Sequence, residues 1–327
     1  MNNKFRSLAW ILLAAVIASC GGSSGGGDGG GEEKVSGLDA RPANLSCIAP
    51  ARPVGPDILG FEAVFNDAWS QLGAITKILK EPGNSDRWFV LDREGGVFVF
   101  SESDPGTVTD WLPALATEVT AEAINGGLLG MAFHPDYPDT PEVFFFYNAV
   151  PFIDGGLVVT RVALDSTDLP VAPIMQRVLM IDQYSQAHQG GDIQFGPDGY
   201  LYVAPGDGGR LRQAQRTTNF LGAMLRIDVE GTGAGYEIPA TDPPNPFSAN
   251  AKCGSGFNAQ DCPEIFAWGF RNPYRWGFDV QDRLWLGDAG EQSWEEINLV
   301  TIGSNYGWPC KEGLDDFIPD ACNNNDI

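Results

Sequence analysis

The sequence predicts an all-β protein of the β-propeller class, and a recurring hairpin pattern carries that prediction. Each copy consists of a hydrophobic strand, a turn containing Pro, Asp or Gly, and an aromatic strand. The four copies occupy residues 89–100, 133–147, 195–203 and 278–286. Further strands often follow, at residues 157–164, 224–229 and 297–300. Repeated sheets of about four short strands are typical of a propeller, whereas a β-sandwich, the alternative, would not repeat one hairpin with such similar turns.

Four hairpins account for about four blades, which we place in residues 37–327. A propeller has to close into a ring, because closure protects the edge strands of its sheets. The spacings of Cys253 to Cys262 and of Cys310 to Cys322 each favour a local disulfide in an exported chain, which leaves Cys47 without a partner. Since the chain also stops abruptly after Cys322, we expect a propeller that is truncated after about four blades, with its C-terminal blades missing.

The N-terminal segment has the composition of an export signal followed by a tether. Lys4 and Arg6 precede an apolar run that ends in small residues before Cys20, a pattern that predicts a lipoprotein signal peptide over residues 1–19. An ordinary secretory signal with an incidental cysteine is the alternative. Residues 20–36 are rich in glycine and predict a flexible linker. We therefore expect an exported protein, periplasmic or associated with the outer membrane, that meets the membrane only through a lipid anchor at Cys20.

The balance of charges excludes some partners. Asp and Glu number 43 against 20 Lys and Arg, which gives a net charge of −23. Such a surface repels nucleic acid phosphates and anionic lipid headgroups. We therefore expect a small-molecule ligand and no nucleic acid partner.

The third hairpin carries the residues most typical of catalysis. His188 lies about as far before its turn as Asp207 lies after it, so antiparallel pairing brings both side chains to the same open end. A histidine beside a carboxylate is the usual arrangement of a general base and the group that orients it. A lone histidine near a strand is more often structural, and Asp207 is what favours a catalytic role for His188.

The other hairpins bring further groups to the same rim. In the fourth, Arg271 and Asn272 precede the turn by about ten residues, and Gly290 and Glu291 follow it at a similar distance. Asn125 occupies the entry side of the second. A guanidinium, a histidine with a carboxylate and glycine-rich backbone together suit a polyanionic ligand, a metal and the abstraction of a proton. The structural alternative is that Arg271 merely binds carbonyls of neighbouring blades.

From about Pro53 to its end, the chain resembles the glucose/sorbosone dehydrogenase family, the soluble quinoprotein sugar dehydrogenases with a six-bladed propeller. The resemblance rests on an ordered set of motifs, which read GGLLGMAFHPDY, HQGGDIQFGPDGYLYVAPGDGG, MLRIDVEG, FRNPYRWGF, GDAGEQSWEEIN and NYGWPCKEG. EEIN and NYGW are shared with the branch related to hedgehog-interacting proteins. The resemblance implies a propeller of the six-bladed quinoprotein type, of which this chain holds about four blades.

The resemblance also implies roles for individual residues. His188 matches the family's catalytic base and Asp207 the acid that orients it. Arg271 and Asn272 match contacts to the cofactor pyrroloquinoline quinone (PQQ). The backbone carbonyls of Gly290 and Glu291 match ligands of the active-site calcium. Asn125 and Gln189 match positions near the sugar substrate.

Three positions depart from the pattern of the glucose enzymes. Asn125 stands where they use a glutamine, Ala187 where they carry an acid, and Asp192 where arginine is common. These departures leave the identity of the sugar open.

Together these implications predict an enzyme that oxidises the anomeric hydroxyl of an aldose to a lactone, with hydride transfer to PQQ and with calcium as a second cofactor. A downstream electron acceptor would be its partner. One alternative is a non-catalytic propeller that binds glycans or proteins, and another is a calcium-dependent lactonase. The pairing of His188 with Asp207 favours the dehydrogenase, since a binding surface has no need of that pair and a lactonase would need several acidic side chains on the metal.

Overall fold

The computed structural model describes residues 69, 72–151, 156–171, 175–230 and 235–322. The predicted signal peptide (residues 1–19), the linker (residues 20–36) and Cys47 lie outside these residues. The described residues all lie in the second of two units of the chain, Glu62–Ile327. All the elements below belong to the second unit.

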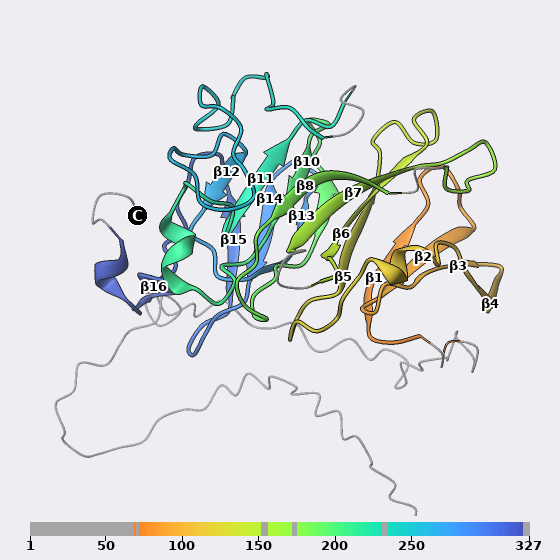
Figure 1. The fold of residues 1–327 in the computed structure, drawn as a ribbon, viewed down its shortest axis with the longest axis horizontal. Coiled ribbons are helices and arrows are strands. Elements are labelled where there is room, and N and C mark those ends of the chain that lie inside the picture. The colour runs from red at the N-terminus through yellow and green to blue at the C-terminus, as the bar shows by residue number, and fades with distance from the viewer. Residues whose placement is uncertain (1–68, 70–71, 152–155, 172–174, 231–234, 323–327) are drawn as a thin grey trace, which may run out of the picture. The chain divides into compact units, whose positions relative to one another are not determined.

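The second unit is built from antiparallel sheets in which strands pair in the order of the sequence (Figure 1). The first sheet contains β1 (Ile75–Lys80), β2 (Arg87–Asp92), β3 (Val97–Ser101) and β4 (Asp104–Asp110). The second contains β5 (Leu128–Phe133), β6 (Glu142–Asn148), β7 (Leu157–Ala163) and β8 (Gln176–Ile181). The third contains β9 (Ile193–Phe195), β10 (Leu201–Val203), β11 (Ala223–Ile227) and β12 (Ile265–Trp268). The fourth contains β13 (Pro273–Phe278), β14 (Leu284–Asp288) and β15 (Glu296–Val300).

Shorter elements complete the described part of the chain. A two-stranded sheet joins β16 (Lys311–Glu312) to β17 (Asp315–Asp316). Three 3₁₀ segments are η2 (Leu115–Thr117), η3 (Leu211–Gln215) and η4 (Pro319–Ala321). Among the described residues there is no α-helix, and no helical segment has the length and hydropathy that crossing a membrane requires. The predicted all-β class and the four-blade propeller arrangement are confirmed.

Each predicted hairpin is present. The four are β2–β3, β5–β6, β9–β10 and β13–β14, and the predicted following strands are β7, β11 and β15. Strands β1, β4, β8 and β12 were not predicted. In β1 the polar Thr76, Lys77 and Lys80 weaken the hydrophobic pattern of a strand. Because β1 comes first, the predicted hairpin is the middle pair of the first sheet and the leading pair of the others.

The core lies between successive sheets, which explains why the middle strands are apolar on both faces. Along β6 the alternation is clear: Phe145 packs with Phe89 and Met131 between the first two sheets. Phe144 and Phe146 belong instead to the cluster between the second and third sheets. Successive residues of a strand point to opposite faces, so one strand supplies two cores. This is the packing of propeller blades.

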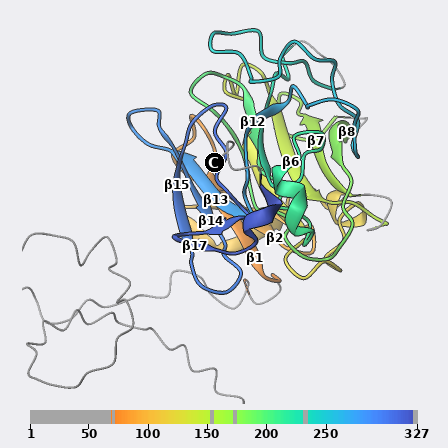
Figure 2. The same ribbon diagram turned by 90° about the vertical axis from the view of Figure 1, so that its left-hand side faces the viewer.

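Charged side chains join the strands of three different sheets. Lys77 on β1 bonds to the Asp192 carboxylate at 2.6 Å, and Asp192, which precedes β9, is only 3% exposed. Arg275 on β13 donates to the Thr76 carbonyl at 2.7 Å and also bonds to the Gly191 carbonyl. In the view of Figure 2, β13 and β1 lie near one another, in agreement with the hydrogen bond of Arg275 to Thr76. The buried Asp192 carboxylate is therefore paired with a lysine of the first sheet.

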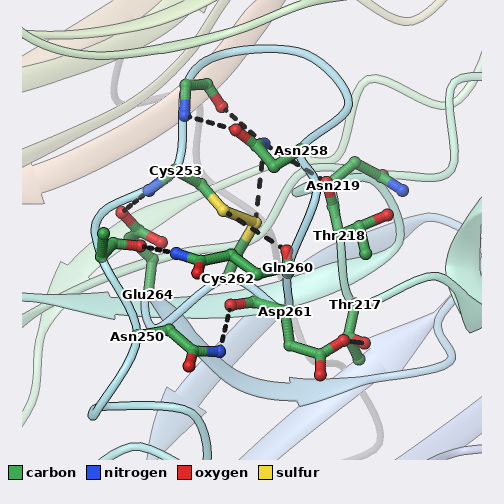
Figure 3. The surroundings of a disulfide bond; sticks show 12 residues. Thr217, Thr218, Asn219, Asn250, Cys253, Asn258, Gln260, Asp261, Cys262 and Glu264 are labelled. Atoms are coloured by element: carbon green, nitrogen blue, oxygen red, sulfur yellow. Dashed lines mark hydrogen bonds between the residues drawn. A yellow bond between two sulfur atoms is a disulfide. The ribbon is translucent and has the colours of Figure 1, made fainter.

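Two local disulfides, Cys253–Cys262 and Cys310–Cys322, are present as predicted. Figure 3 shows the first with its surroundings. Glu264 lies beside it, and one of its oxygens accepts hydrogen bonds from the Tyr236 hydroxyl at 2.7 Å and from the Cys253 N–H at 3.0 Å. Its Oε2 is buried and has no hydrogen-bond partner among the described residues. Burial raises the pKa of Glu264, and these hydrogen bonds only partly oppose it.

Replacing Glu264 with glutamine is expected to stabilise the protein increasingly as the pH rises. A carboxyl whose pKa is higher in the folded state binds its proton more tightly when folded, so its contribution to stability falls as the pH rises from its unfolded pKa through its folded pKa. Glutamine keeps the shape and the Oε1 acceptor but cannot ionise. The midpoint temperature of thermal unfolding of Glu264→Gln should equal that of wild type at pH 4 and lie about 2–4 °C above it at pH 8. A constant difference across this range would contradict the prediction.

Candidate active site

His188 and Asp207 meet at the open end of the third hairpin, as the sequence predicts. The pairing of Ile193 with Val203 leaves both residues beyond the strand ends. His188 Nδ1 lies 2.6 Å from Asp207 Oδ1. The histidine side chain is 15% exposed, whereas Asp207 is fully buried. A buried carboxylate therefore holds one nitrogen of the ring while part of the imidazole remains open to a ligand.

Close packing of two glycine-containing loops sets the position of His188. Its backbone has φ of +54°, in the left-handed region that a residue other than glycine seldom adopts. A Cβ at Gly206 would lie 2.3 Å from the His188 carbonyl oxygen, so only glycine allows the two loops to approach. The Gly208 N–H also donates to that carbonyl at 3.3 Å. The surrounding loops thus hold His188 in an unusual backbone conformation.

Asp207 has a further partner that the sequence analysis did not identify. The indole Nε1–H of Trp308 donates to Asp207 Oδ2 at 2.8 Å, and the Gly209 N–H donates to Oδ1 at 2.7 Å. Trp308 is buried. The motif NYGWP marks the residue, but nothing local in the sequence indicates a contact to a side chain 101 residues earlier.

The fourth hairpin brings Arg271 and Glu291 together, again as the sequence predicts. The guanidinium donates to the Ala289 carbonyl at 2.9 Å and forms an ion pair with the Glu291 carboxylate. It also lies over the Trp308 ring, 5.5 Å from the ring centroid. Its buried Nε has no hydrogen-bond partner among the described residues. The Arg271 guanidinium therefore contacts the tryptophan that donates a hydrogen bond to Asp207, and its Nε–H remains available as a donor.

Asn272 joins the two hairpins. Its Oδ1 accepts the Gly190 N–H at 2.9 Å, and the Asp207 N–H donates to the neighbouring carbonyl of Arg271 at 2.8 Å. Asp288 accepts the N–H groups of both Arg271 and Asn272. Burial raises the pKa of Asp288 to about 7, although these two backbone donors act against the shift.

Gly290 and Glu291 lie in a tight loop that encloses another carboxylate. A Cβ at Gly290 would lie 1.7 Å from the Trp294 carbonyl oxygen. Glu312 Oε1 accepts four consecutive N–H groups, from Glu291 at 2.7 Å to Trp294 at 3.3 Å. Burial works to raise the pKa of Glu312, but these donors outweigh it and hold the pKa below its ordinary value. No described residue donates to the carbonyl oxygens of Gly290 or Glu291, which leaves them free to bind a cation.

The two residues predicted near the substrate differ in their surroundings. Asn125 is half-buried, and its Oδ1 is buried without a hydrogen-bond partner among the described residues. The Ile124 N–H bonds to the Gln186 carbonyl at 2.8 Å, which places Asn125 beside the His188 loop. Gln189 is fully buried, with its amide bonded to Asn148 at 2.7 Å and to carbonyls of its own loop. Asn125 thus has capacity for a ligand, whereas Gln189 is occupied in holding the loop.

Residues 79–320 match the family model described as glucose / sorbosone dehydrogenase. This match spans well over half of the chain. The chain belongs to the glucose/sorbosone dehydrogenase family.

Within this family the chain is similar to both plant and bacterial members. It is 29% identical to HIPL2 protein of Arabidopsis thaliana over 76% of this chain and 42% of the relative. It is 30% identical to quinoprotein glucose dehydrogenase B of Acinetobacter calcoaceticus over 72% of this chain and 50% of the relative. The PQQ-bound aldose sugar dehydrogenase of Streptomyces coelicolor superposes with a TM-score of 0.58 at 26% identity, covering 74% of this chain and 64% of that structure. The chain spans about half the length of the curated relatives it matches.

Proposed function

We propose that the protein oxidises the anomeric hydroxyl of an aldose to the corresponding lactone, with PQQ and calcium as cofactors. The pair formed by His188 and Asp207 carries the proposal. Asp207 accepts the Nδ1 proton of His188, so the second ring nitrogen, Nε2, is available to accept a proton from a sugar hydroxyl. The buried carboxylate then stabilises the imidazolium that forms. Membership of a sugar dehydrogenase family supports this role.

The residues present fit both cofactors in specific respects. The spare Nε donor of Arg271 suits a carboxylate of PQQ. The free carbonyls of Gly290 and Glu291 are oxygen ligands of the kind that calcium prefers. When bound, PQQ supplies the acceptor for the hydride that leaves the sugar carbon, while His188 takes the hydroxyl proton. The Glu291 carboxylate contacts Arg271, so a cofactor carboxylate would compete with it for the guanidinium.

The test is to prepare the protein without cofactors, add PQQ and calcium, and follow the reduction of a dye with a panel of aldoses. We expect the dye to be reduced only when both cofactors and a sugar are present. The dye takes the place of the natural electron acceptor. If PQQ demonstrably binds and no aldose reduces the dye, the proposed activity is wrong.

A binding module is the second candidate, because the relatives include the HIPL proteins and, at 28% identity, the human hedgehog-interacting protein. In that case glycan or protein binding should persist after His188 is replaced. A calcium-dependent lactonase is less well supported, since the carboxylates near Gly290 already have partners: Glu291 pairs with Arg271, and Glu295 and Glu312 accept backbone N–H groups. Calcium binding that is indifferent to added PQQ would favour it.

We also propose that the protein is exported and anchored by a lipid at Cys20. The basic residues, apolar run and cysteine of the N-terminal segment support this. Metabolic labelling with a radioactive fatty acid in a bacterial host should mark the wild-type protein and not Cys20→Ser. Equal labelling of both would contradict the anchor.

A further inference from the structure

Asp288 fixes the backbone that carries the two predicted cofactor contacts. Its side chain is 5% exposed, and its two oxygens accept the N–H groups of Arg271 at 2.8 Å and Asn272 at 2.6 Å. Each oxygen thus serves a different, consecutive residue. One carboxylate restrains two successive peptide groups, which fixes the direction in which both side chains leave the backbone.

The pairing of β13 with β14 explains why a side chain is needed at this point. Asp288 ends β14 opposite Pro273, which has no N–H to donate. The register also shifts between Pro273 and Arg275, so the regular ladder is interrupted there. The Asn272 carbonyl keeps a partner on this side, the Ala289 N–H at 3.2 Å. The N–H groups of Arg271 and Asn272 are bonded instead to the Asp288 carboxylate, which takes the place of ladder acceptors there.

Arg271 and Asn272, which Asp288 holds, form hydrogen bonds with the loops of the catalytic pair. The Arg271 carbonyl accepts the Asp207 N–H at 2.8 Å, and the Asn272 side chain accepts the Gly190 N–H at 2.9 Å. Gly190 lies two residues after His188. The hydrogen bonds of Asp288 therefore lead in two steps to both loops that hold the catalytic pair.

We infer that Asp288 is a positioning residue, which holds the PQQ-binding side chains in place relative to the pair of His188 and Asp207. This inference rests on the proposed function. It predicts that weakening one hydrogen bond of Asp288 disturbs cofactor affinity and the catalytic histidine together, although Asp288 itself touches neither.

The decisive variant is Asp288→Asn, which keeps the volume but offers one acceptor oxygen in place of two. Asp279→Asn is the matched control, because Asp279 accepts the N–H groups of Gln281 and Arg283 at the opposite, turn end of the same hairpin. We expect Asp288→Asn to bind PQQ about tenfold more weakly, as judged by fluorescence quenching of the cofactor-free protein, and to turn over about tenfold more slowly. Asp279→Asn should match wild type in both measurements.

A second measurement needs neither cofactor nor sugar. The chain has only two histidines, so the downfield proton resonance of His188 Nδ1–H, bonded to Asp207, is assigned by its loss in His188→Gln. Asp288→Asn should shift this resonance or speed its exchange with solvent, and Asp279→Asn should not. This result stands even if no sugar is oxidised, which separates failure of the inference from failure of the proposed function. Unchanged PQQ affinity and an unchanged resonance in Asp288→Asn, or equal changes in Asp279→Asn, would overturn the positioning role.

Discussion

Replacing His188 with glutamine is expected to lower the turnover number with an aldose by about two to four orders of magnitude, the usual range for loss of a general base. Glutamine retains a polar group near Asp207 but cannot accept the proton of a sugar hydroxyl at neutral pH. Affinity for PQQ and calcium should remain near that of wild type, because the predicted cofactor contacts lie in the fourth hairpin. The measurement is turnover at saturating PQQ, with cofactor binding determined separately.

Asp207→Asn provides the matched comparison. It preserves the shape of the group that orients His188 but removes the charge that stabilises the imidazolium, so turnover should fall less than in His188→Gln. The Trp308 indole N–H would also face an amide in place of a carboxylate oxygen. Wild-type turnover in His188→Gln at saturating PQQ would show that His188 is not the base, and would favour the binding-module function.

Local patterns allowed the sequence to predict the hairpins and the contact between His188 and Asp207. A turn such as Pro197-Asp198-Gly199 determines how two short strands pair, and residues equally far from the turn then meet. The same reasoning placed Arg271 near Glu291. These predictions needed no knowledge of how one blade packs against another.

Contacts between blades are the part that sequence patterns could not supply. Trp308 reaches Asp207 across 101 positions and Lys77 reaches Asp192 across 115, and no periodicity encodes such distances. The sequence did not predict a role for Asp288, because that role depends on the interrupted ladder at Pro273. Gln189, which follows His188 in the sequence, was predicted near the substrate, but its side chain is buried and bonded to Asn148.

Arg271→Ala is expected to weaken PQQ binding far more than it slows the reaction of the loaded protein. Removing a buried guanidinium leaves a bound carboxylate without its charge-assisted partner, at a cost of about 2–5 kcal/mol, which corresponds to an affinity loss of about 30-fold to 4,000-fold. The side chain is 11% exposed, so water can replace it only in part. Titration of the cofactor-free protein with PQQ measures this loss directly.

Glu291→Gln is the control that separates Arg271 as a cofactor contact from Arg271 as a structural tie. The Glu291 carboxylate is paired with the guanidinium, and its side chain is 34% exposed, so under the proposed function it would compete with a PQQ carboxylate for Arg271. Glutamine removes that competitor while leaving the Glu291 carbonyl in place for calcium. If Arg271 binds the cofactor, Glu291→Gln should bind PQQ as tightly as wild type or more tightly, in contrast to Arg271→Ala. If Arg271 only stabilises the loops through its ion pair with Glu291, both variants remove that ion pair and should weaken PQQ binding to a similar extent.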